Sequence, residues 1–117
     1  MRLTRFGYHE SLRRAIKELN PIAYYPLDDG ADGKAMNIAY GHEHSPDATV
    51  SGALTQQEGH NSKAMSLDGI NDIIISDSNL GIEGNSPCSL LIMVHLASDT
   101  TDDLISFGQG DSNGRPF

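Results

Sequence analysis

Apolar and polar residues alternate most clearly at residues 65–68, and three consecutive isoleucines follow at 73–75. A period of two is typical of a strand with one buried face, and β-branched residues suit a pleated surface. Between these stretches lies Gly-Ile-Asn-Asp, in which Gly69 can adopt a positive φ angle. The pattern predicts a β-hairpin in which residues 65–67 and 73–75 pair across a turn at Gly69.

A different period marks the N-terminal segment. Apolar residues recur there at i, i+3, i+4 and i+7, which indicates an amphipathic helix over residues 9–19. The apolar stripe consists of Leu12, Ala15, Ile16 and Leu19. Arg13 and Arg14 lie outside this stripe, and Pro21 ends the helix because proline disfavours the α conformation in the preceding residue. An isolated helix of this length is marginal in water, so its stripe must pack on its own chain or on a neighbour.

The rest of the chain reads as short strands between polar connections. Strand patterns cover residues 22–27, 48–54 and 89–96, and another strand begins at residue 104. The 89–96 stretch is apolar enough for a strand that is buried on both faces. Residues 56–62 read as a polar turn. These patterns predict an all-β chain behind one helix.

Three stretches, in this order along the chain, resemble laminin-G-like domains of the concanavalin A-like jelly-roll class. Residues 23–29 read Ala-Tyr-Tyr-Pro-Leu-Asp-Asp, like the opening strand of that family. Residues 65–75 contain Leu-Asp-Gly-x-x-Asp-Ile-Ile, like its next strand pair. Residues 86–94 resemble a later strand, in which Cys88 and Met93 stand near the places where the family usually carries Phe and Trp.

The resemblance spans residues 22–117 and implies an all-β fold, the N-terminal part of a concanavalin A-like (laminin-G-like) jelly-roll sandwich preceded by a short α-helical arm. We therefore expect a basic N-terminal arm with its amphipathic helix at 1–20 and an incomplete sandwich at 21–117. The strands are too few to close a sandwich of this class, so we expect the chain to continue beyond Phe117.

The charges are divided unevenly. Residues 1–20 carry five bases and two acids, a net +3, whereas the remaining residues carry three bases and 14 acids, a net −11. A basic arm on an acidic body predicts that the arm docks on an acidic surface, such as another subunit. The acidic body argues against nucleic acid as the main partner, because phosphate contacts need clustered Lys and Arg. The predicted assembly interface comprises Leu12, Ala15, Ile16, Leu19, Arg13 and Arg14.

No catalytic motif stands out. The sequence has no Gly-x-Ser-x-Gly nucleophile turn and no Gly-Lys-Ser/Thr phosphate loop. Acid pairs such as Asp28-Asp29 read as turn residues rather than as a carboxylate pair fixed across a cleft. We therefore expect no enzymatic activity, and His60 and His95 are expected to be surface or hydrogen-bonded side chains. Cys88, the single cysteine, excludes an internal disulfide and is expected to be an inert buried thiol.

Metal binding has two candidates. His42 and His44 alternate on one segment and can face the same ion, but no third ligand follows at a recognisable spacing, which favours a solvated loop. The resemblance adds calcium: pentraxin-like relatives with this sandwich hold it by a loop at the place of Asp111 and Asn113. We expect no tightly bound cofactor and keep calcium as the alternative.

Two functions remain open. In the first, suggested by the resemblance, the chain is a structural component of a bacteriophage virion, a minor tail or baseplate protein. Its arm would bind other tail subunits, copies would form a symmetric ring, and the sandwich would contact host glycans. In the second, it is a carbohydrate-binding module of a bacterial surface or secreted protein. That module would need an export signal, which residues 1–20 do not resemble, and no apolar run is long enough to insert into a membrane.

Overall fold

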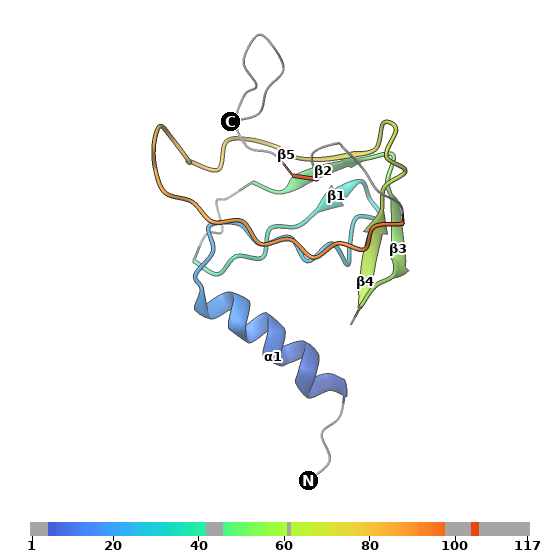
Figure 1. Ribbon diagram of the computed structural model, residues 1–117, viewed down its shortest axis with the longest axis horizontal. Helices are drawn as coiled ribbons and strands as arrows, with labels where there is room; N and C mark the ends of the chain where they lie inside the picture. The colour runs from blue at the N-terminus through green and yellow to red at the C-terminus, as the bar shows by residue number, and fades with distance from the viewer. Residues whose placement is uncertain (1–4, 42–45, 61, 98–103, 106–117) are drawn as a thin grey trace. The chain divides into compact units, whose positions relative to one another are not determined.

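The computed structural model describes residues 5–41, 46–60, 62–97 and 104–105. The helix and strands in these ranges are α1 (Arg5–Glu18), β1 (Lys34–Ala35), β2 (Ala48–Ser51), β3 (Leu54–Glu58), β4 (Lys63–Ser66) and β5 (Ile73–Ser76) (Figure 1). The chain forms two compact units, Met1–Ser86 and Pro87–Phe117, and every one of these elements belongs to the first. The prediction of β structure behind one helix is confirmed at this level.

Helix α1 confirms the predicted helix, although it begins at Arg5 rather than at residue 9. In its last turn the amides of Leu19 and Asn20 donate to the carbonyl groups of Ile16 and Lys17, at 3.1 and 2.9 Å. Asn20 then adopts a φ of 50°, a left-handed conformation that asparagine tolerates better than most residues. The helix therefore closes with a tightened turn immediately before Pro21.

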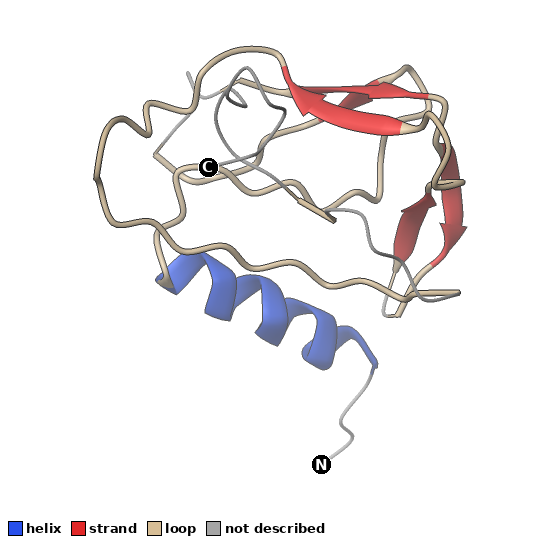
Figure 2. Cartoon of the chain, turned by 45° about the horizontal axis from the view of Figure 1, so that its top comes forward, coloured by secondary structure: helices blue, strands red, loops and turns tan. Residues whose placement is uncertain are grey.

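The strands form two antiparallel sheets, one with the order β1-β2-β5 and one made of β3 and β4 (Figure 2). Four of the strands form one long hairpin, with β2 and β3 on its first arm and β4 and β5 on its second, and β1 pairs with β2. The arms meet at a turn where the Gly59 amide donates to the Ser62 carbonyl at 2.8 Å. β3 pairs with β4 beside this turn, and β2 pairs with β5 further along the same two arms. Residues 56–62, predicted to be a turn, therefore belong partly to β3.

The predicted hairpin at Gly69 is wrong. β4 and β5 do not pair with each other but enter different sheets, on either side of a corner at residues 67–72. In this corner Asp68 Oδ1 accepts the Ile70 amide at 2.8 Å, and Asp72 Oδ2 accepts the Asp68 amide at 2.8 Å. These side-chain bonds hold the corner as a separate turn, so the strands leave it towards different partners. Gly69 does adopt the expected positive φ, 74°.

Two more strand predictions fail. Residues 22–27 form no ladder; the backbone there makes an isolated bond from the Ile38 amide to the Tyr24 carbonyl at 2.9 Å. Residues 89–96, in the second unit, contain no strand, and their side chains are exposed instead of buried on both faces. The reason is that the described part of that unit contains no second strand to pair with them.

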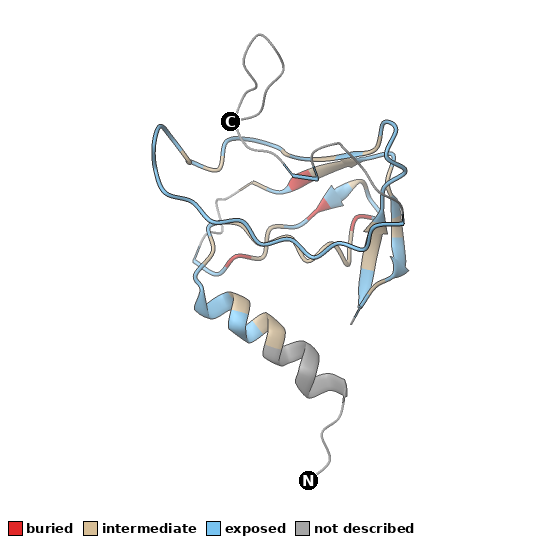
Figure 3. Cartoon of the chain, in the orientation of Figure 1, coloured by how far each residue is buried: buried red, intermediate tan, exposed pale blue. Residues whose placement is uncertain are grey.

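Few side chains are buried. One face of the β1-β2-β5 sheet carries Ala35 and Ala48, which are almost fully buried, and Figure 3 shows these short buried segments against a largely exposed chain. Among the described residues no large side chain is fully buried. On the opposite face of the sheet, Ile73 and Ile75 are about half exposed. Cys88 is exposed as well, so the prediction of a buried thiol is wrong.

Candidate functional site

One ion pair connects helix α1 to the loop that precedes β1. Nη2 of Arg13 lies 2.6 Å from Oδ2 of Asp28, a distance typical of a strong charge-assisted hydrogen bond. The side chains keep 35% and 28% of their surface exposed, so water and salt screen the attraction. The pair joins the basic arm to the acidic body.

The residue before Asp28 has an unusual backbone conformation. Leu27 has a φ of 60°, a region in which a bulky residue costs about 1–3 kcal/mol. The Asp28 carbonyl accepts Nε2 of Gln56 at 2.8 Å, and Oδ2 of Asp29 accepts the Met36 amide at 2.8 Å. Contacts from β3 and from the residue after β1 therefore fix this loop and the carboxylate that it presents.

Gly30 lets the same loop approach the second sheet. Its φ is 93°, and a β-carbon at this position would collide with the side-chain end of Met65 in β4. The loop therefore packs directly on the β3–β4 pair. The Asp28 carboxylate, which pairs with Arg13, therefore belongs to a loop that is packed against these two strands.

Three buried polar atoms form no hydrogen bond among the described residues: Nε of Arg13 in α1, Oδ1 of Asp29 in this loop and Nδ2 of Asn37 after β1. An unsatisfied buried group typically costs about 1–3 kcal/mol, so such atoms usually mark an incomplete set of contacts. Burial also raises the pKa of the Tyr24 phenol; Arg13 opposes this rise and Asp28 adds to it.

The structure divides the predicted assembly residues into two groups. Leu12, Arg13 and Ile16 are half-buried, whereas Arg14, Ala15 and Leu19 are exposed, Leu19 to 72%. Successive helical residues are 100° apart, so the covered side of α1 is rotated away from the centre of the apolar stripe. Part of the stripe, Ala15 and Leu19, thus remains exposed. The role of these residues in assembly stays a prediction.

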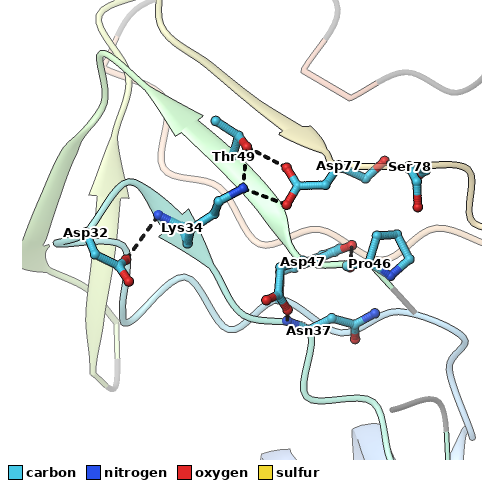
Figure 4. A network of polar contacts seen from close by, with 10 residues as sticks. Asp32, Lys34, Asn37, Pro46, Asp47, Thr49, Asp77 and Ser78 are labelled. Carbon is cyan, nitrogen blue, oxygen red and sulfur yellow. Dashed lines mark hydrogen bonds and ion pairs between the residues drawn. The ribbon is translucent and has the colours of Figure 1, made fainter. Parts of the chain in front are cut away.

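A second polar cluster crosses the outer face of the three-stranded sheet (Figure 4). Nζ of Lys34 in β1 donates to Oγ1 of Thr49 in β2 at 2.9 Å and to Oδ2 of Asp77 at 2.7 Å. The Thr49 hydroxyl donates to the other carboxylate oxygen of Asp77. The bond to Lys34, and then that to Thr49, lowers the pKa of Asp77. This cluster ties the three strands together and reads as a structural element.

The described residues contain no group of three or more His, Cys, Asp or Glu side chains that could hold a metal ion. The candidates His42 and His44, and the calcium candidates Asp111 and Asn113, lie outside the described residues, so both metal hypotheses stay predictions. Within the ranges that the structure describes, no helix combines the length and the apolar character needed to cross a membrane.

No protein-family model, curated protein or solved structure matches this chain. The laminin-G-like resemblance accordingly stays a prediction from three short stretches. From the sequence, Asp28 reads as an ordinary turn residue, and its contact with Arg13 is not predicted. No spacing rule links positions 13 and 28. The division of charge between arm and body indicates that the arm binds acidic residues, but it does not indicate which acidic residue pairs with Arg13.

Proposed function

We propose that this protein is a structural component of a bacteriophage virion, a minor tail or baseplate protein whose basic N-terminal arm attaches it to neighbouring subunits. The observation that carries the assembly role is the shortage of buried apolar side chains. Domains normally bury their large aliphatic residues, and contiguous exposed apolar surface marks interaction sites. Here the buried apolar side chains of the described residues are alanines, while many aliphatic side chains are exposed.

Three exposed apolar surfaces support this proposal. One is the Ala15–Leu19 edge of helix α1. Another is strand β5, which lies at the edge of its sheet among the described residues and carries two half-exposed isoleucines. Edge strands are usually protected by charges, prolines or bulges, and Ile-Ile-Ile-Ser has none of these. The third is the 89–96 segment, with exposed aliphatic side chains along its length. Each surface is of the kind that another polypeptide covers in an assembly.

The virion context comes from the laminin-G-like resemblance together with the arm that precedes it. Mass spectrometry of gradient-purified phage particles from the source culture tests it. We expect peptides of this chain in the particle fraction, at a constant ratio to the major tail protein and after a high-salt wash. Peptides found only in the soluble fraction would contradict a virion role.

The alternative function is a carbohydrate-binding module. Tyr40 is 79% exposed, and an exposed aromatic ring offers a flat apolar face on which a sugar ring can stack. Binding to a glycan array, lost in Tyr40→Ala and kept in Tyr40→Phe, would favour this alternative. Glycan binding by a chain that is also found in particles would combine both functions, with the sandwich as a host-contacting domain.

A further inference from the structure

We propose that helix α1 is exchanged between copies of this protein, so that Arg13 of one chain forms its ion pair with Asp28 of another. This inference rests on the proposed assembly function and adds the partner, a second copy, and the residues of the contact. Exchange of an identical element between protomers is a low-cost route to oligomers, because the contacts of the closed monomer are reused.

Charge complementarity identifies a second copy as a suitable partner. The arm has a net charge of +3 and the rest of the chain −11. The bodies of two copies therefore repel each other, whereas the arm of one copy is attracted to the body of the other. Every copy also presents the same fixed receptor, the Asp28 carboxylate on the loop held by Gln56 and Gly30. An arm that leaves its own body therefore finds an equivalent acceptor on a neighbour.

The junction within one chain is incomplete. Nε of Arg13 and Oδ1 of Asp29 are both buried without hydrogen-bond partners in the part of the chain that the structure describes, and the ion pair is partly exposed. The arm connects to the body through Asn20, at a φ of 50°, and Pro21, and this short link restricts how the helix can lie on its own loop. A helix from another copy is free of this restriction and can place its guanidinium group to satisfy more of these atoms.

Exchange also explains the position of the apolar stripe. Leu12 and Ile16 lie on the covered side of α1, while Ala15 and Leu19 stay exposed at the edge of the stripe. When two arms cross between two bodies, these edges come together near the crossing point and bury each other. Reciprocal exchange gives a two-fold dimer, and head-to-tail exchange gives a ring when the rotation closes.

Charge reversal in two separate variants tests the exchange. Arg13→Glu and Asp28→Lys each place like charges at the junction, within one chain as well as between identical chains. We expect each variant alone to associate roughly tenfold more weakly than the parent, the scale of one charge pair at a partly exposed site. In an equimolar mixture every junction exchanged between the two different variants unites opposite charges, whereas every junction within one chain still unites like charges. Association should therefore return to the parent level.

The readout is native mass spectrometry with one variant labelled with ¹⁵N. Assemblies containing labelled and unlabelled chains in a 1:1 ratio support exchange, and a mixture that behaves as the sum of its two variants overturns it. Lys17→Glu is the matched control: it makes a charge reversal at an exposed residue of the same helix and should weaken association less than Arg13→Glu does. An equal loss in the two variants would overturn the specific role of Arg13.

Cysteine crosslinking keeps the test decisive if a reversed variant does not fold. Arg13→Cys and Asp28→Cys, each made with Cys88→Ser, are mixed and treated with a short bismaleimide, which replaces the reach of the arginine side chain. A crosslinked heterodimer as the main product is the expected result, and its absence overturns the exchange. Particles that contain the chain although no exchange occurs would leave the proposed function standing, so the two proposals can fail separately.

Discussion

The carboxylate of Asp72 lies directly against the α-carbon of Gly52, in the space that a β-carbon would occupy. Gly52 follows β2, and Asp72 immediately precedes β5, so this contact joins the two places where the arms of the long hairpin pass from one sheet to the other. The bend of the hairpin therefore depends on a residue without a side chain at this position.

A pair of glycine substitutions isolates this contact. Both Gly52 and Gly69 have positive φ angles, 84° and 74°, but a β-carbon at Gly69 meets no atom within 4 Å. We expect Gly69→Ala to lower the free energy of unfolding by about 1 kcal/mol through backbone strain alone. Gly52→Ala should cost about 2–4 kcal/mol, because overpacking against Asp72 is added. Urea denaturation measures both, and equal costs would show that the contact with Asp72 is unimportant.

Acid should destabilise the sheets through two carboxylates. Bonds from the backbone, led by the Ile70 amide, lower the pKa of Asp68, and the bond from Lys34 lowers that of Asp77, both from an ordinary value of 3.8. A carboxylate whose pKa is lower in the folded state binds fewer protons there than in the unfolded state. Its contribution to stability is therefore complete above pH 3.8 and is lost as the pH falls through the folded-state pKa.

Thermal melts between pH 6 and pH 2.5 check this expectation. Asp77→Asn and Asp68→Asn should each be less stable than the parent at pH 6 and should lose less stability on acidification. Glu83→Gln, a change at an exposed carboxylate in the connection after β5, serves as the control and should follow the parent curve. Parallel curves for all four proteins would contradict the assignment of the acid sensitivity to these two residues.

The sequence predicts local features of this fold better than pairings between distant segments. The helix was found because its stripe is a pattern within one short segment. The hairpin was misplaced because β3, Leu-Thr-Gln-Gln-Glu, contains a single large aliphatic residue and a Gln56 with φ of 59°, so nothing local marks it as a strand. The isoleucines of β5 were recognised as a strand, but their partner β2 lies more than 20 residues earlier, and no local pattern identifies it.

The candidate site was predicted only in part. Arg13 was expected to bind an acidic surface, and the structure shows it on Asp28 of the same chain. Asp28, rather than another acidic residue, pairs with Arg13 because the φ of Leu27 and the bond from Gln56 hold its loop in place. Both features form only when the sheets fold. Cys88 and residues 89–96 were expected to be buried because they are apolar. Apolar character indicates that a segment tends to be covered, but it does not identify the segment or chain that covers it.

The 89–96 segment offers a separate test of the assembly role. Leu91 is 70% exposed, so Leu91→Lys should change the free energy of unfolding by less than about 0.5 kcal/mol. If another subunit covers the segment, the same change should weaken association at least tenfold, because a buried unpaired charge is costly. Ser89→Lys adds the same charge at an exposed polar position and should have a smaller effect. Light scattering against concentration measures both variants, and identical behaviour of the two would argue against burial of Leu91.

Sedimentation equilibrium tests the central claim, that this chain is an assembly subunit held by its N-terminal arm, most directly. The parent is compared with a truncation that starts at Pro21, with folding of both followed by circular dichroism. We predict a parent mass well above 12.6 kDa at micromolar concentration and a folded, monomeric truncation. A parent that stays at 12.6 kDa at every concentration, or a truncation that still assembles, would contradict it. An aggregated truncation would also count against the account, because it would show that the helix covers the core of its own chain.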